Sequence, residues 1–338
     1  MPYYCPMYDK LQYTREQSQM LKGVAILFMI CFHLFAPNPA SPQHGLSFSY
    51  TGIDAIIGHF CNRTVPLYIF MTGYSLYICA ILSVKEVLTQ KVIPLYRQMW
   101  ILALVFLPIL FLLGKIEWSW GRFLHTVTIG DGYIRIWWYV GFYALLMTIV
   151  SVAYAIWNSG GGKNSKHILI PVTIVALLLY FFVDDKYNMP FLINRFVKFT
   201  VYLLLGYWVA RYRVLSYYRR NVVVSVVLLA IIVSLNYLPM HDFLYRLYRL
   251  LSFPLMVACF IDIIDRRGMR NIFRYLGRHS TNIWLIHGFF YYYFYQFVYM
   301  PKYWLLILVS FTMVNIACSL GYNHLIGNAF TSKRHNNK

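Results

Sequence analysis

Residues 19–37 read QMLKGVAILFMICFHLFAP, an almost unbroken apolar stretch that holds one lysine, Lys22, and one histidine, His33. A helix needs about 20 mostly apolar residues to cross a bilayer, so this stretch has the length of a membrane span. A Pro-rich sequence follows it without a small-residue cleavage site. We therefore expect a retained span rather than a cleaved signal peptide.

The rest of the chain has the same apolar character. Of its 338 residues, 60% are hydrophobic and 12% are charged, and the mean hydropathy is +0.55. Soluble domains are about 45–50% apolar and about 25% charged. This composition excludes a soluble enzyme, a coiled coil and a disordered tail.

Nine further stretches resemble the first in length and hydropathy, which predicts an all-α integral membrane protein with about ten transmembrane helices. We expect one polytopic domain over residues 1–338, with its core at about 15–325 and a polar cytoplasmic tail at 325–338. Between the first two spans, residues 53–58 are expected to form an interfacial or re-entrant helix. The ten predicted spans are 19–37, 62–82, 94–113, 133–157, 167–184, 197–212, 221–239, 246–264, 280–299 and 302–324.

The net charge of +19 comes from 30 Lys and Arg against 11 Asp and Glu. If the N-terminus is cytoplasmic, about two thirds of the cations fall in cytoplasmic segments, as the positive-inside rule requires. We therefore expect a multi-pass protein of the cytoplasmic membrane with both termini inside. Because the charge serves orientation, no nucleic-acid partner is expected. The six cysteines are scattered without a C-x-x-C pair, so no metal site is expected either.

Charged groups inside lipid are costly, so each one is a candidate for function. The acidic residues fall in loops or near span ends, which argues against an ion-coupled transporter. His33 and His287 lie within predicted spans. Lys22 and His33 are eleven residues apart, which places them on one helix face with an axial separation of about 16 Å. They could line a route across the bilayer, or they could be a snorkelling lysine and a histidine hydrogen-bonded between helices.

Four motifs resemble, in order and spacing, those of the membrane-bound acyltransferase-three family over about residues 15–325. Lys22-x10-His33 is similar to the family's Arg-x10-His motif, with Lys in place of Arg, which keeps the charge and loses the bidentate fork. The others are VPLYIFMTGY at 65–74, with Met71-Thr72 where small residues are usual, IWWYV at 136–140 and YLGRHSTNIWLIH at 275–287. Ten spans is the usual number in this family.

The resemblance implies acetyl-CoA as a donor that arrives from the cytoplasm and a glycan hydroxyl on the outer side as the acceptor. His33 is then expected to act as the base that takes the hydroxyl proton or as the nucleophile that carries the acyl group. Lys22 would orient the donor. Lys91 and Arg97 match the family's basic, Pro-containing segment and could bind the CoA phosphates, although a role in topology alone also fits them.

Trp137 and Trp138 are expected either in an interfacial aromatic belt or as a platform for the acceptor sugar. Asp131 and Arg135 beside them could hydrogen-bond the acceptor. His287 falls about seven residues into its predicted span, about 10 Å from the cytoplasmic side. A packing or donor-channel role is therefore expected for His287 rather than chemistry.

The sequence thus predicts a membrane O-acetyltransferase whose partners are membrane lipid, a glycan acceptor and a separate envelope protein of glycan assembly. The alternative is a glycan or lipid transporter, flippase or polymerase of a polysaccharide export pathway. That class predicts large outer loops or charges in the middle of spans, and neither is visible in the sequence.

Overall fold

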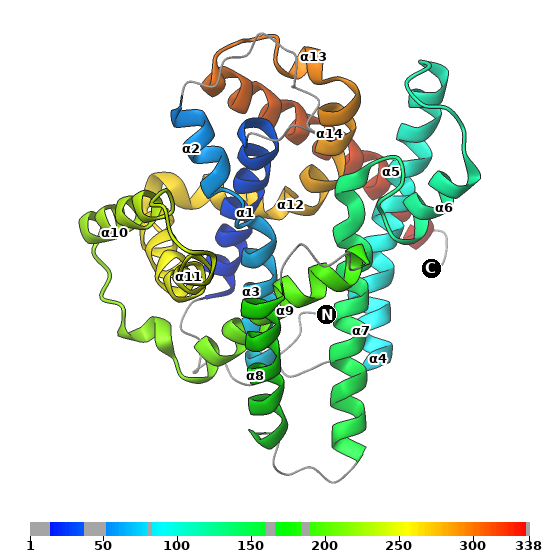
Figure 1. The fold of residues 1–338 in the computed structure, drawn as a ribbon. Helices are drawn as coiled ribbons and strands as arrows, with labels where there is room; N and C mark the ends of the chain where they lie inside the picture. Colours follow the sequence, from blue (N-terminus) through cyan, green and yellow to red (C-terminus); the bar gives the residue numbers. More distant parts are fainter. Residues whose placement is uncertain (1–13, 37–51, 80–82, 160–165, 184–189, 336–338) are drawn as a thin grey trace. The chain divides into compact units, whose positions relative to one another are not determined.

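A computed structural model describes residues 14–36, 52–79, 83–159, 166–183 and 190–335, and every regular element in these ranges is a helix (Figure 1). The helices of the first half are α1 (Arg15–Phe35), α2 (Ile53–Phe60), α3 (Thr64–Ile78), α4 (Val84–Val87), the π-turn η2 (Leu88–Val92), α5 (Ile93–Leu112), α6 (Trp120–Thr128), the 3₁₀ turn η3 (Arg135–Trp137) and α7 (Trp138–Ser159). The second half holds α8 (Lys166–Phe182), α9 (Phe191–Arg211), the 3₁₀ turn η4 (Val214–Tyr217), α10 (Val222–Leu235), α11 (Asp242–Ile264), α12 (Arg267–Tyr293), α13 (Tyr295–Val298) and α14 (Trp304–His335).

Five of the described helical segments are long and apolar enough to cross a membrane. They are Arg15–Phe35, Val84–Leu112, Arg135–Ile156, Asp242–Ile264 and Trp304–Leu325, and Leu169–Phe182 and Val222–Leu235 are shorter apolar helices. The chain is therefore an all-helical, multi-pass membrane protein, as predicted. Each of the ten predicted spans overlaps a helix, and in the described ranges five of these helical segments meet the length and composition of a membrane span.

The helices differ from the predicted spans most clearly in the last third of the chain. The predicted span 280–299 is part of α12, which begins at Arg267 and ends at Tyr293, where α13 takes over. The first half of α12 is rich in arginine, so the start of this helix does not have the apolar character of a membrane span. Helix α14 continues to His335, so the predicted polar tail is largely helical. The expected helix at 53–58 is α2, whereas the Pro/Ser-rich residues before it lie outside the described ranges.

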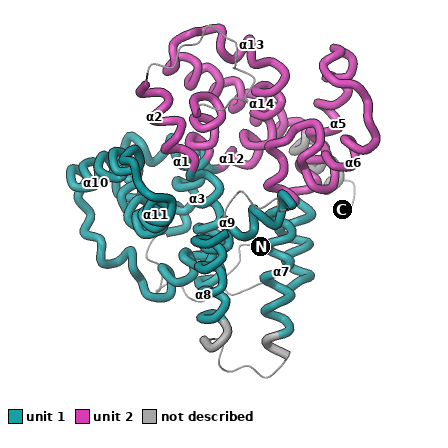
Figure 2. The backbone as a smooth tube through the Cα atoms, in the orientation of Figure 1, with its two compact units in different colours: residues 1–25, 63–94, 142–277 teal, residues 26–62, 95–141, 278–338 magenta. Residues whose placement is uncertain are grey.

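The chain divides into two compact units (Figure 2). Unit 1 consists of residues 1–25, 63–94 and 142–277, and unit 2 of residues 26–62, 95–141 and 278–338. Helices α1, α5, α7 and α12 contribute residues to both units.

In unit 1, α3 packs against α9 through two glycines. A Cβ atom on Gly73 would lie 1.8 Å from the carbonyl oxygen of Leu203, and one on Gly206 would lie 2.1 Å from that of Phe70. Both distances are far below van der Waals contact, so only glycine lets the two helix backbones approach so closely. Small residues serve helix association in membranes in the same way.

In unit 2, the core is formed by α5, by the segment that runs from Tyr133 through η3 to the start of α7, and by the second half of α12. Phe106 of α5 stacks on Phe289 of α12 with ring centroids 4.1 Å apart. Trp137 is completely buried, and its indole Nε1 donates a hydrogen bond of 2.7 Å to the carbonyl oxygen of Leu285. These contacts fix the segment of α12 that carries His287.

Candidate active site

Helix α1 holds His33 in a defined orientation. The Nδ1 atom of His33 lies 2.9 Å from the carbonyl oxygen of Met29, one helical turn earlier. A carbonyl oxygen can only accept a hydrogen bond, so Nδ1 carries the hydrogen and Nε2 keeps its lone pair. The side chain of His33 belongs to a partly exposed residue.

Helix α12 holds His287 in the same way. Its Nδ1 atom lies 2.6 Å from the carbonyl oxygen of Trp284. The side chain is fully buried, and Nε2 has no hydrogen-bond partner among the described residues. Buried polar atoms are nearly always hydrogen-bonded, so an exception in a native structure points to a functional role.

The two imidazoles lie next to each other. Their ring centroids are 5.1 Å apart, and the ring of Tyr291, one turn further along α12, lies 5.5 Å from that of His33. The sequence predicts different depths for the two histidines, because it places His287 near the cytoplasmic start of a short span. Since α12 begins at Arg267, His287 instead lies about 30 Å along the helix and at the level of His33.

This arrangement is suited to proton transfer or to nucleophilic attack. A neutral imidazole with a free Nε2 can take a proton from a hydroxyl group or attack a carbonyl carbon. The Nδ1 hydrogen bond to a backbone oxygen fixes the tautomer that either role requires. His33 is the accessible member of the pair, and His287 lies behind it with no exposed surface.

In unit 1, Lys22 gathers with other cations. It lies on α1 and is half-buried, and Lys91 and Arg15 are close enough to repel it electrostatically. Lys91 is exposed and belongs to the π-turn η2 between α4 and α5. Such π-turns occur frequently at functional sites. The structure therefore brings together Lys22 and Lys91, whose predicted donor roles come from two separate motifs.

Arg97, the other predicted donor ligand, lies on α5 in unit 2. It is exposed and close enough to Tyr322 of α14 to influence it electrostatically. An exposed guanidinium group can contact a phosphate without losing much hydration, which is compatible with the predicted role.

The four predicted acceptor residues have different environments. Trp137 is buried in the core of unit 2 with no exposed surface, so its ring cannot stack on a sugar in this conformation, and it does not form part of an interfacial belt. Trp138 is half-exposed. Asp131 lies 3.2 Å from Nδ1 of His125, and Arg135 is exposed.

Unit 2 also contains a buried polar network that the predicted site does not include. Oγ of Ser319 lies 2.8 Å from Nδ1 of His279 and accepts a hydrogen bond of 3.0 Å from Nδ2 of Asn282. Asn282 also donates to Asn323 and accepts from Gln98 of α5. The signal was present in α14, where the polar residues Asn315, Ser319 and Asn323 follow one another at intervals of four.

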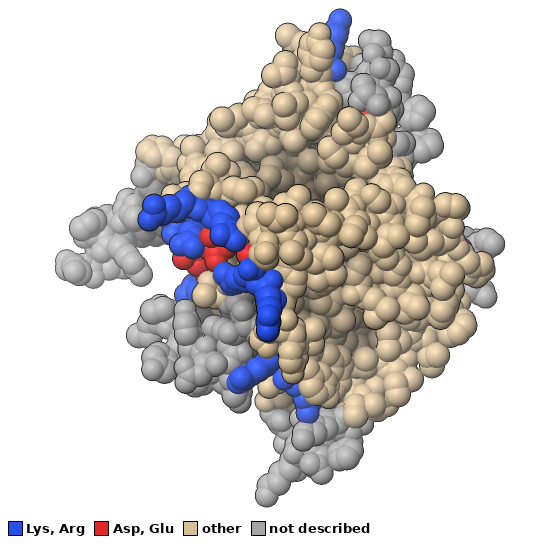
Figure 3. Space-filling view, turned by 90° about the vertical axis from the view of Figure 1, so that its left-hand side faces the viewer, with Lys and Arg blue, Asp and Glu red and all other residues tan. Residues whose placement is uncertain are grey.

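Charged residues of unit 1 form a second network near Asp265, which follows α11. Figure 3 shows Lys and Arg side chains gathered around a few acidic ones on a face that is otherwise largely uncharged. Asp265 forms ion pairs with Arg220 and Arg270 and accepts a hydrogen bond of 2.7 Å from Gln17. Partial burial opposes ionisation of Asp265, but the bonds from Gln17, Arg220 and Arg270 prevail and lower its pKa. Glu16 pairs with Arg274 in the same unit.

The described residues contain no group of three or more His, Cys, Asp or Glu side chains that could hold a metal ion. Within these ranges, the candidate chemistry rests on the two imidazoles of unit 2 and, separately, on the cations of unit 1.

Comparison with protein families matches residues 17–324 to the family described as Acyltransferase domain, Acyltransferase 3. The match covers most of the chain, so the protein belongs to this family and is a membrane acyltransferase. An acyltransferase requires an acyl donor. Comparisons with curated proteins and with solved structures find no match.

Proposed function

We propose that this member of the Acyltransferase 3 family moves an acetyl group from cytoplasmic acetyl-CoA to a hydroxyl group of a cell-surface or lipid-linked glycan. Both termini would lie in the cytoplasm, so that the donor reaches the protein from the side of Lys22. The observation that most supports the proposal is the pair His33 and His287, whose rings lie 5.1 Å apart.

In a direct transfer, Nε2 of His33 accepts the proton of the acceptor hydroxyl while the hydroxyl oxygen attacks the thioester carbonyl. The thiolate of CoA then leaves and takes up that proton. In a two-step transfer, Nε2 attacks the carbonyl first and displaces the thiolate of CoA, which leaves an acetyl group on the imidazole. The acceptor hydroxyl then attacks this acetyl group, the bond to Nε2 breaks, and the thiolate takes up the hydroxyl proton. Both routes require the lone pair that the bond from Nδ1 to Met29 leaves on Nε2.

His287 would act as a positioning residue. It is fully buried behind His33, and its Nε2 atom has no partner among the described residues. A second imidazole at this distance can orient His33 or stabilise the positive charge that His33 acquires during proton transfer.

On the donor side, Lys22 and Lys91 would bind the anionic part of CoA. Their mutual repulsion leaves a positive potential that a phosphate can neutralise. Arg97 would provide a further phosphate contact from its exposed position. For the acceptor, Trp138, Asp131 and Arg135 remain the proposed contacts.

The central experiment compares the O-acetyl content of surface glycans, by NMR or by mass, in cells that express wild type or His33→Ala. We expect wild type to raise acetylation and His33→Ala to abolish the increase. His59→Ala is a matched control, because His59 is an exposed histidine of unit 2 on α2. A well-folded His33→Ala protein with full acetylation would exclude His33. If wild type raises the acetylation of no glycan in any host, the proposed acetyltransferase activity is contradicted.

The donor site is tested separately with purified protein. Binding of acetyl-CoA should weaken as the salt concentration rises and when Arg97 is replaced by Ala. Lys22→Arg keeps the charge and should retain binding if charge is sufficient. Binding that is insensitive to salt would contradict a phosphate contact.

A further inference from the structure

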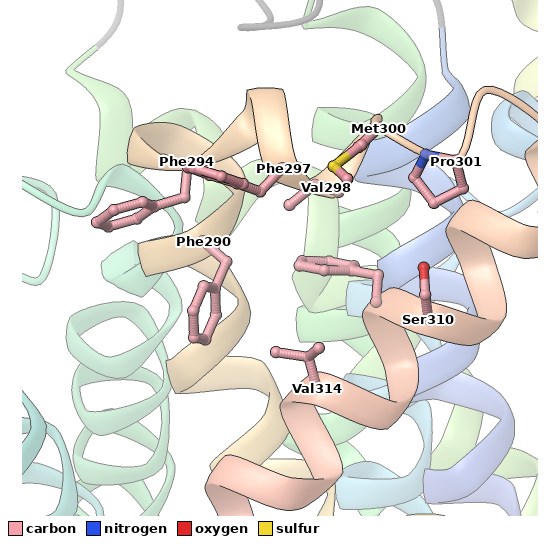
Figure 4. A pocket seen from close by; sticks show the side chains of 9 residues that line it. Phe290, Phe294, Phe297, Val298, Met300, Pro301, Ser310 and Val314 are labelled. Atoms are coloured by element: carbon pink, nitrogen blue, oxygen red, sulfur yellow. The ribbon is translucent and has the colours of Figure 1, made fainter.

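Unit 2 contains an apolar pocket between the end of α12, α13 and α14 (Figure 4). Its volume is about 430 Å³, within the range of about 300–1,000 Å³ for small-molecule sites. The side chains of Phe290 and Val314 stand on opposite sides of the space in Figure 4. Val298 and Phe311, which also line the pocket, are buried.

The walls favour a hydrocarbon chain over a polar ligand. Ser310 is the one polar side chain among the lining residues, and its hydroxyl donates to the carbonyl oxygen of Ile307 in its own helix. A sugar or a phosphate in this pocket would lose hydrogen bonds to water and find few in return. The pocket therefore suits the apolar part of a molecule.

The pocket opens beside exposed apolar side chains. At its rim, Phe297 is 71% exposed and Met300 is 70% exposed. The exposed apolar residues Val309 and Met313 continue this surface along α14, which is apolar and long enough to cross the membrane. If α14 crosses the bilayer, this apolar surface would contact lipid, and a lipid could reach the pocket from the side.

The pocket is also next to the histidine pair. On α12, Phe290 follows His287 by three residues, which places the two within about 60° on one face of the helix, and Phe294 follows directly after the end of α12. Beyond α13, Oη of Tyr299 donates a hydrogen bond of 2.7 Å to the carbonyl oxygen of Leu34, the residue after His33. A chain in the pocket would therefore end one to two helical turns from the two imidazoles.

We propose that this pocket binds the hydrocarbon chain of a lipid-linked glycan acceptor and so presents the polar head of that lipid to His33. This inference rests on the proposed function and narrows its acceptor from glycans in general to those attached to a membrane lipid.

Binding is tested with the purified full chain in lipid nanodiscs and a photoreactive isoprenyl phosphate. We expect cross-links to residues 290–314, which unlabelled isoprenyl phosphate removes and excess phosphatidylcholine does not. Cross-links elsewhere, or equal competition by phosphatidylcholine, would overturn the proposal, because the pocket would then be a general lipid cleft or not a lipid site.

Transfer is tested with two acceptors from one source: the lipid-linked glycans extracted from host membranes, and the oligosaccharides released from that extract by mild acid. Val314→Trp fills the pocket and should raise KM for the lipid-linked acceptor about tenfold, while the kinetics with the released oligosaccharides stay unchanged. Leu320→Trp, an exposed position of α14 outside the pocket, is the matched control. Ser310→Leu provides the same test if the tryptophan variant does not fold.

The two acceptors also separate this inference from the proposed function. If wild type acetylates both acceptors equally well, or if Val314→Trp and Ser310→Leu leave KM for the lipid-linked acceptor unchanged, the pocket does not bind the acceptor chain while the activity stands. If wild type acetylates neither acceptor, the proposed function has failed.

Discussion

Trp137 donates a hydrogen bond from its indole Nε1 to the carbonyl oxygen of Leu285, two residues before His287. The donor is completely buried, and the acceptor belongs to the part of α12 that carries the candidate chemistry. An aromatic residue that looks like a sugar platform in the sequence is thus a structural support for the histidine pair.

Replacing Trp137 by Phe should weaken this support. The variant loses the hydrogen bond and leaves a cavity where the indole stood, so we expect a loss of about 2–4 kcal/mol in stability. Acyl transfer should fall through kcat, because the position of His287 becomes less defined. Thermal unfolding in detergent and kinetics check both effects. Trp138→Phe, at a half-exposed position, serves as the control, and equal stability of the two variants would contradict the assignment.

Replacing His287 by Gln should lower kcat about 10- to 100-fold and leave the KM for the acyl donor nearly unchanged. Glutamine can keep a hydrogen bond to the backbone, but it supplies no second imidazole beside His33. If His287 served only in packing, His287→Phe would preserve kcat better than His287→Gln, because phenylalanine fills the same space. Steady-state kinetics of both variants distinguish the two roles.

Replacing Ser319 by Ala should destabilise unit 2 by about 1–3 kcal/mol. The change removes a hydroxyl that bonds both His279 and Asn282 in a buried setting, and unsatisfied buried groups carry a cost of this size. Ser216→Ala, at an exposed serine of η4, should have a much smaller effect. A double-mutant cycle of Ser319→Ala with Asn282→Ala should give a coupling energy, and strict additivity would show that the network is not cooperative.

Acid should destabilise unit 1 through Asp265. Its pKa in the folded protein is lowered below the ordinary value of 3.8, because the bonds from Gln17, Arg220 and Arg270 outweigh partial burial. The ionised carboxylate therefore contributes stability above the unfolded pKa, and this contribution is lost as the pH falls through the folded pKa. Asp265→Asn should reduce stability at neutral pH and flatten this acid dependence. Glu117→Gln, which removes an exposed acidic residue, should change neither the stability at neutral pH nor its acid dependence. If Asp265→Asn loses stability in acid as steeply as wild type, Asp265 is not the group responsible.

The fold class could be predicted from the sequence because repeated apolar stretches of about 20 residues match the thickness of a bilayer. The spacing of eleven residues was sufficient to predict that Lys22 and His33 lie on one helix. The proximity of His287 could not be predicted, since the start of α12 is marked by arginines rather than by apolar residues. A search for apolar spans therefore placed the histidine at the wrong level.

The burial and the contacts of individual side chains could not be predicted from the sequence either. The pattern IWWYV contains two adjacent tryptophans, and only the packing of α7 and α12 shows that one is buried and the other half-exposed. The polar network at Ser319 was overlooked because a survey of ionisable groups ignores serine and asparagine. Neutral polar residues four apart in an apolar helix are a usable signal for such networks.

The glycine contact between α3 and α9 bears on adaptation to temperature. Gly73 and Gly206 have no side chain to immobilise when the two helices meet, so their contact incurs no loss of rotamer entropy. A contact of this kind should change little in strength as a membrane cools and its lipid chains become ordered. We therefore expect the fit between α3 and α9 to depend on the approach of the two backbones rather than on side-chain rotamers.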